Sequence, residues 1–191
     1  MNKIFFKSVT ILVILLTFTG CNTIAKYTGQ QHETWKVRTY SNSSMIKDLI
    51  QKGMITKDTR LNAISSIAKS DDKVYLLEAY GTFNILRGIN ARNTQDATMK
   101  FASKLALKNN FKGFNIILPH DLREANLNSY SEFKEQCYAN PVSGRTHNCG
   151  AFLSDTGGNN GSKGVIALQL SNSKANGTYF DARETLLIIN Q

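Results

Sequence analysis

Side chains that could act as general acids, bases or nucleophiles are present, but they are scattered along the chain. The three histidines, His32, His120 and His147, lie far apart, and none stands four residues from another as in a helical metal motif. The sequence contains no Gly-x-Ser-x-Gly elbow that would expose a nucleophilic serine. We therefore interpret the carboxylates between residues 121 and 135 as solvated surface, although folding could still gather them with a histidine. They include Asp121, Glu124, Glu132 and Glu135.

Lysines recur at helical spacing in the middle of the chain. Lys100, Lys104 and Lys108 stand at positions i, i+4 and i+8, and Lys112 follows. This spacing places the first three along one face of a helix, where like charges repel one another mildly. One interpretation is a solvated helix face. The other is a basic ridge that contacts anionic lipid headgroups, lipopolysaccharide phosphates or an acidic envelope protein.

The N-terminus has the composition of an export signal. Lys3 and Lys7 precede an apolar run at 9–18, which is shorter than the roughly 20 residues that a membrane-spanning helix needs. The run ends in Phe18-Thr19-Gly20-Cys21. Small residues directly before a cysteine at this place resemble the lipobox of bacterial lipoproteins, with Phe18 in place of the usual aliphatic residue. The resemblance covers residues 1–21 only, and the alternative is an ordinary signal peptide that leaves Cys21 as a thiol.

The lipobox resemblance implies that the leader 1–20 is removed and that Cys21 carries a diacylglyceryl group. Several acyl chains make a stable anchor, so the protein would be held on a membrane without spanning it. Lipoproteins with aspartate after the lipid-bearing cysteine are generally retained in the inner membrane of Gram-negative bacteria. Because Asn22 occupies that position, the resemblance favours the outer membrane, facing the periplasm.

Two cysteines, Cys137 and Cys149, remain if Cys21 is lipidated. Exported compartments are oxidising, so we expect these two to form a disulfide. Turn-forming residues between them, such as Pro141 and Gly144, would bring the ends of the loop together. A metal site formed with His147 is the alternative, but the sequence offers no fourth ligand at a usual zinc spacing.

Two glycine-containing segments near the C-terminus suggest chemistry at first sight. Asp155-Thr156-Gly157 resembles the signature of aspartic proteases, but those enzymes need two such aspartates and this chain has one copy. The glycine-rich segment 157–164 lacks the Gly-Lys-Ser/Thr order of a phosphate-binding loop. We interpret Asp155 as a turn residue and the glycine-rich segment as a hairpin loop.

Composition indicates a folded and basic protein. Hydrophobic residues make up 41% of the chain and charged residues 19%, unlike a disordered tail. Removing Lys3 and Lys7 from the 23 basic residues leaves 21 against 14 acidic residues, a formal charge of +7. In the envelope, such a charge would suit anionic surfaces as partners if the lysines have a function, and we do not expect nucleic acid as a partner in that compartment.

The elements that would position these residues follow from hydrophobic periodicity. The best helix should begin at Asn93 or Thr94 and continue to about Asn109, with Ala97, Phe101, Ala102, Leu105 and Ala106 on its core face. Helices are also predicted at 45–52 and 58–69. Strands are predicted at 34–40, at 73–89 as one bent or two strands, at 114–118, as a hairpin of 149–154 with 165–171, and at 185–189.

Strands and helices that mix without strict alternation favour an α+β fold over a parallel α/β fold. The predicted organisation is a leader at 1–20, a lipidated N-terminus and tether at 21–33, and one domain at 34–191. We expect a noncatalytic binding or scaffolding module of the envelope, without cofactor or bound metal. The alternative is a small periplasmic hydrolase, which a pocket with convergent histidine and carboxylate groups would favour.

Overall fold

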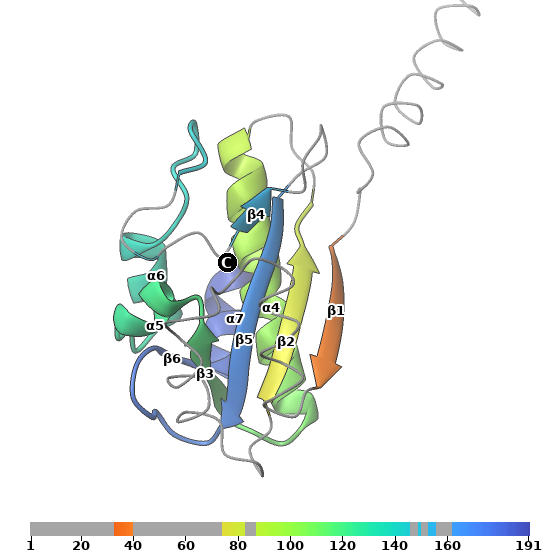
Figure 1. The fold of residues 1–191 in the computed structure, drawn as a ribbon, viewed down its shortest axis with the longest axis vertical. Helices are drawn as coiled ribbons and strands as arrows, with labels where there is room; N and C mark the ends of the chain where they lie inside the picture. The colour runs from red at the N-terminus through yellow and green to blue at the C-terminus, as the bar shows by residue number, and fades with distance from the viewer. Residues whose placement is uncertain (1–32, 40–73, 83–86, 146–148, 150–152, 156–161) are drawn as a thin grey trace, which may run out of the picture.

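The computed structural model describes residues 33–39, 74–82, 87–145, 149, 153–155 and 162–191 (Figure 1). Strands and helices form a single antiparallel sheet with helices packed on it, so the predicted α+β class is confirmed. In chain order the elements are β1 (Thr34–Thr39), β2 (Val74–Tyr80), α4 (Arg87–Lys108), β3 (Gly113–Leu118), α5 (His120–Glu124), α6 (Tyr130–Gln136), β4 (Leu153–Asp155), β5 (Ser162–Ser171), β6 (Tyr179–Asp181) and α7 (Ala182–Ile189).

The sheet has the strand order β1-β2-β5-β3-β6, and every pair in it is antiparallel. Because β2 and β3 both run antiparallel to β5, they are parallel to each other with β5 between them. Helix α4 connects these two strands. The short strand β4 pairs antiparallel with the beginning of β5, from Leu153 opposite Gly164 to Asp155 opposite Ser162. The predicted strand 165–171 is thus part of β5, but β5 begins earlier, so residues 162–164 are strand and not the loop that we predicted, and it is these residues that pair with β4.

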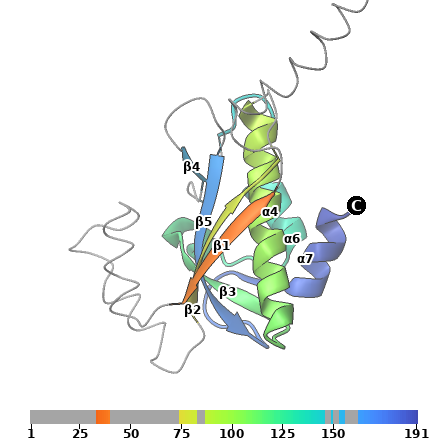
Figure 2. The same ribbon diagram turned by 90° about the vertical axis from the view of Figure 1, so that its right-hand side faces the viewer.

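Helices α4, α6 and α7 lie on the same side of the sheet (Figure 2). The core between them and the strands is rich in aromatic side chains, and burial of this apolar area stabilises the fold by about 25 cal/mol per Å² removed from water. Tyr130, Phe133 and Phe180 contact one another edge-on or stacked, with ring centroids 5.3 to 6.2 Å apart. The core therefore joins α6 to strand β6 next to α7.

Helix α4 buries the predicted face but begins earlier than predicted. Its apolar side chains from Ala97 to Ala106 are buried, as their spacing required. The segment from Arg87 to Ile89, which we predicted as strand, is the first turn of the helix. Gly88 lies there against the backbone of Pro141, where a Cβ atom would be 2.1 Å from the carbonyl carbon. This long-range contact has no periodic signal in the sequence.

The end of α4 is confirmed at the two asparagines. Asn110 has φ +63°, in the left-handed region, and the Phe111 N–H donates to the Ala106 carbonyl. The Asn110 N–H donates to the Leu107 carbonyl, which completes the Schellman pattern that closes many helices.

Glycines let α4 approach the sheet closely. A Cβ atom on Gly164 of β5 would lie 1.9 Å from the Thr98 hydroxyl of α4, and one on Gly81 would lie 2.3 Å from the Asn93 backbone. Thr98 is fully buried there and donates its hydroxyl proton to the Thr94 carbonyl. The first half of the helix thus packs directly against glycine backbone. The buried hydroxyl of Thr98 has its hydrogen-bond partner within the helix.

The strand predicted at 185–189 is wrong, because this segment belongs to helix α7. Asp181 caps the helix, since its carboxylate accepts from the backbone N–H groups of Arg183 and Glu184. A short apolar run cannot distinguish a strand from a buried helix by itself. The cap decides the helix start, and packing of α7 against α4 buries one of its sides.

Other predictions have mixed outcomes. The strands predicted at 34–40 and 114–118 are confirmed as β1 and β3. The helices predicted at 45–52 and 58–69 lie outside the described residues. Helices α5 and α6 and strand β6 were not predicted, because they fall in a polar stretch without long apolar runs.

Candidate functional site

The two cysteines expected to pair are joined. The Sγ atoms of Cys137 and Cys149 are bonded, and the Cα atoms are 5.3 Å apart. Cys137 is the C-cap of α6, and Cys149 precedes β4. Both sulfur atoms are thereby used, so the alternative metal site would lack its thiolate ligands while the bond is intact. In the part of the chain that the structure describes, no three His, Cys, Asp or Glu side chains are placed to hold a metal ion.

Gln95 of α4 holds the backbone on both sides of Tyr138, directly after the disulfide-bonded Cys137. Its amide donates to the Cys137 carbonyl at 3.1 Å and accepts from the Ala139 N–H at 2.8 Å, and the side chain is fully buried. One turn away, the Arg92 Nε donates to the Ala139 carbonyl at 2.5 Å. Helix α4 therefore positions the segment after α6 independently of the disulfide.

Asp96, the next residue of α4, accepts hydrogen bonds from two tyrosines. The Tyr130 hydroxyl donates to Oδ1, and the Tyr138 hydroxyl donates to Oδ2 at 2.7 Å. Burial first, and then the charge and hydrogen bond of Asp96, raise the pKa of Tyr130 and Tyr138 well above the usual value. Both tyrosines are thus neutral donors at ordinary pH.

Cations complete this cluster around Tyr138. The Arg92 guanidinium lies 4.6 Å from the centre of the Tyr138 ring, and the Lys134 ammonium lies 5.3 Å from it. Such contacts stabilise by about 0.5–1 kcal/mol each at partly exposed sites. The group of Arg92, Gln95, Asp96, Tyr130 and Tyr138 consists of mutually satisfied partners, which is the arrangement of a structural network between α4 and α6.

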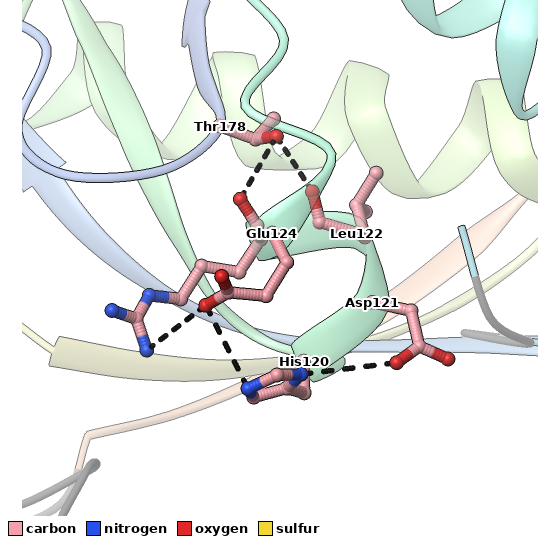
Figure 3. Close-up of polar contacts among 6 residues, drawn as sticks. His120, Asp121, Leu122, Glu124 and Thr178 are labelled. Carbon is pink, nitrogen blue, oxygen red and sulfur yellow. Dashed lines mark hydrogen bonds and ion pairs between the residues drawn. The ribbon is translucent and has the colours of Figure 1, made fainter. Parts of the chain in front are cut away.

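The structure places His120 between two carboxylates, those of Asp121 and Glu124 (Figure 3). Its Nδ1 lies 3.8 Å from Asp121 Oδ1, and its Nε2 lies 3.6 Å from Glu124 Oε1. Both distances exceed those of good hydrogen bonds. The carboxylate side chains are 59% and 56% exposed, so this group lies on the surface of α5 rather than in a closed pocket.

The nearby hydroxyl of Thr178 has a structural role. It donates to the Leu122 carbonyl at 2.6 Å (Figure 3), and it also accepts from the Leu127 N–H at 3.0 Å. Thr178 is fully buried, so these hydrogen bonds replace those that its hydroxyl and the two backbone groups would make to water in the unfolded chain. They tie the end of α5 to the segment before β6.

Glu132, expected to be solvated surface, takes part in the start of α6. Its backbone N–H donates to the Ser129 hydroxyl at 3.1 Å, and its carboxylate accepts from the Asn128 N–H at 2.8 Å. The order Ser-x-x-Glu from 129 to 132 is the sequence signature of such a capped helix. That signature could have revealed α6 before the structure was known.

The predicted basic ridge divides into a paired lysine and exposed ones. The Lys100 ammonium lies 2.7 Å from Glu33 Oε2, and its side chain is only 24% exposed. Lys104, Lys108 and Lys112 are exposed, and the Lys104 ammonium lies 5.5 Å from the centre of the Phe101 ring. Lys100 thus joins α4 to the residue before β1, and the exposed charges follow it along the chain.

The remaining sites of the sequence fall mostly outside the described residues. Cys21, His32, His147 and the glycine-rich segment 157–161 are among these, and Asp155 is the last residue of β4. Within the described ranges, no helix is long and apolar enough to cross a bilayer. Comparison of the chain with protein-family models, with curated proteins and with solved structures finds no match.

Proposed function

We propose that this chain is a lipoprotein of the bacterial envelope, held by lipid at Cys21 on the periplasmic side of the outer membrane. Its folded domain is a noncatalytic binding or scaffolding module. The observation that carries the proposal is the N-terminal order of two lysines, a short apolar run and Thr19-Gly20-Cys21.

The lipid would supply the membrane affinity that the folded domain needs to stay in place. Each buried CH₂ group contributes about 0.8 kcal/mol, and a diacylglyceryl group presents two chains. Glu33, the first described residue, stands twelve positions after Cys21. Even fully extended, that length of chain reaches at most about 40 Å, so the domain stays close to the membrane.

The bond between Cys137 and Cys149 supports an exported location. Disulfides persist in the periplasm and outside cells, whereas the cytosol keeps thiols reduced. Cys149 is 1% exposed and Cys137 is fully buried, so the pair is built into the core next to α6.

Binding rather than catalysis is favoured by the way the polar groups are used. Both oxygens of Asp96 accept from tyrosines, and both ends of the Gln95 amide hold backbone. His120 and its carboxylates form an exposed surface group, without the burial that usually tunes an acid–base pair. The exposed lysines after Lys100 instead offer positive charge to a partner.

The anchor is tested by replacing the cysteine that would carry it. Cys21→Ser should abolish labelling of the protein by a palmitate analogue in growing cells. The variant should also lose the membrane association that depends on the lipid, which fractionation of the cells measures. The variant Cys137→Ser/Cys149→Ser retains Cys21 as its sole cysteine and should still be labelled. Unchanged labelling of the Cys21→Ser protein would refute lipidation at this residue.

A further inference from the structure

The lone tryptophan of the chain packs against α4, on the same phenylalanine ring as the exposed Lys104. Trp35 of β1 stacks on Phe101, with ring centroids 5.2 Å apart and planes inclined by 4°. The Lys104 ammonium lies over the same Phe101 ring. Trp35 is nevertheless 37% exposed, although it is the largest side chain of the strand. An exposed tryptophan beside lysines combines an apolar ring with positive charge on one surface.

This surface begins where the tether enters the domain. Glu33 directly precedes β1, and its ion pair with Lys100 fastens the entry point to α4. Figure 2 shows β1 at the edge of the sheet beside α4. Since an α-helix rises about 1.5 Å per residue, Lys104 and Lys108 follow Lys100 at about 6 and 12 Å along the axis. These distances are short compared with the reach of the tether.

The positive charge of this surface is not cancelled by the acids nearest to it in the chain. Glu33 is engaged by Lys100, and Asp96, the lone acid within α4, is engaged by the hydroxyls of Tyr130 and Tyr138. Lys104 and Lys108 are exposed on successive turns. A surface of this kind attracts a planar array of negative charges.

We propose that Trp35, Lys104 and Lys108 form a docking face that binds the anionic phospholipid headgroups of the membrane in which the protein is anchored. The proposal rests on the proposed function, because the tether brings this face to the bilayer. Tryptophan favours the boundary between headgroups and acyl chains, where its ring is buried and its N–H remains hydrated. Lysine stems lie along the apolar boundary while their ammonium groups reach the phosphates.

Docking is an equilibrium between two orientations of the anchored domain, with this face on the membrane or away from it. A lysine near an anionic surface favours the docked orientation by about five-fold, so two lysines contribute roughly 30-fold. Because exposed charges are screened over about 8–10 Å at physiological salt, added salt should weaken docking.

The experiment uses Trp35 as a reporter of its own position. The full chain purified from cells is reconstituted into vesicles of phosphatidylcholine, with or without phosphatidylglycerol, and flotation measures association. Quenching by brominated phospholipids then measures contact of Trp35 with the bilayer. We expect quenching on vesicles that contain phosphatidylglycerol, a loss of quenching at high salt, and little quenching on phosphatidylcholine alone.

Variants separate charge from fold. Lys104→Gln/Lys108→Gln should reduce the docked-to-undocked ratio by roughly 30-fold, whereas Lys104→Arg/Lys108→Arg should retain it. Lys36→Gln is the control, because it removes an exposed lysine of the same strand that alternation places on the opposite face from Trp35. Lys36→Gln should reduce the quenching of Trp35 no more than the loss of one positive charge from anywhere on the domain would. Equal melting temperatures confirm that all the variants are folded.

The outcomes distinguish the two proposals. Flotation with phosphatidylcholine vesicles, but without any phosphatidylglycerol-dependent quenching of Trp35, would overturn the docking face and leave the anchor standing. Flotation only with phosphatidylglycerol, lost in Lys104→Gln/Lys108→Gln, would overturn the anchor and retain the face. Association with neither kind of vesicle would overturn both. Quenching that the glutamine variant does not change would show that these lysines do not bind the headgroups.

Discussion

At the scale of single residues, the side chains of Arg92, Gln95 and Asp96 on α4 hold a segment more than 40 positions away. Gln95 binds the backbone at Cys137, which is 42 residues further along, and Asp96 binds Tyr138 at the same separation. A hydrogen bond to a charged group contributes about 1.5–3 kcal/mol, more than one between neutral groups. The tyrosine–aspartate bonds should therefore be visible both in stability and in titration.

The pH dependence of stability should reveal the tyrosines bonded to Asp96. Their pKa values in the folded protein are raised above the ordinary value of 10.0. Below pH 10 this contribution to the free energy of unfolding is fully present, and it is lost as pH rises towards the folded-state values, because the unfolded chain releases these protons first. We expect denaturant unfolding to show falling stability above about pH 10.

Tyr138→Phe should lower the free energy of unfolding at pH 7 by about 1.5 kcal/mol, because Asp96 loses one charged hydrogen bond. The same variant should also show a shallower loss of stability above pH 10. Absorbance titration of the wild-type protein provides an independent measurement, in which Tyr130 and Tyr138 should ionise later than in the unfolded chain. Ionisation of all seven tyrosines together near pH 10 would contradict the network.

At the scale of elements, helix caps decide where the short helices begin. Ser129 and Asp181 accept backbone N–H groups at the first turns of α6 and α7. The apolar content of these segments is not sufficient to select a helix, because seven or eight residues show too little periodicity. The caps also orient the helices, since each fixes the entry of the chain into its first turn.

Removing the α7 cap should destabilise the domain. We expect Asp181→Ala to lower the free energy of unfolding by about 1 kcal/mol, because two N–H groups lose their acceptor. Asp181→Asn retains an acceptor and should restore most of that loss. Asp121→Ala is the matched control, since Asp121 is exposed in the first turn of α5 and the structure shows no side-chain cap there. Denaturant unfolding followed by circular dichroism measures all three, and equal losses from Asp181→Ala and Asp121→Ala would argue against the cap.

At the scale of the whole molecule, the disulfide and α4 hold the same region in two ways. The bond links the end of α6 to the residues before β4, across a sequence separation of 12. The amide of Gln95 and the guanidinium of Arg92 hold residues 137–139 on the helix. Reduction of the disulfide should therefore mainly increase the conformational freedom of the unfolded chain, and it should change the folded structure little.

Loss of the disulfide should lower stability without dissolving the fold. Cys137→Ala/Cys149→Ala should decrease the free energy of unfolding by roughly 3 kcal/mol, the chain-entropy value for a loop of this size. Hydrogen exchange should still protect the Ala139 N–H, which donates to Gln95, and Gln95→Ala should remove that protection. Rapid exchange at Ala139 in the disulfide-free protein would show instead that the covalent bond positions the segment.

Features that depend on the local order of residues could be predicted before the fold was known. Helical spacing identified the buried face of α4, the asparagines at its end identified the stop, and alternation or compact apolar runs identified β1 and β3. The other features depend on contacts between residues that are distant in the chain, and they became visible only in the folded protein. Residues 185–189 are helical because of the Asp181 cap and the packing against α4. Lys100, which we predicted on a ridge with Lys104 and Lys108, pairs instead with Glu33, 67 residues earlier in the chain. Hydrophobic periodicity reports which face of an element is buried, but it contains no information about which polar groups will meet when those faces pack.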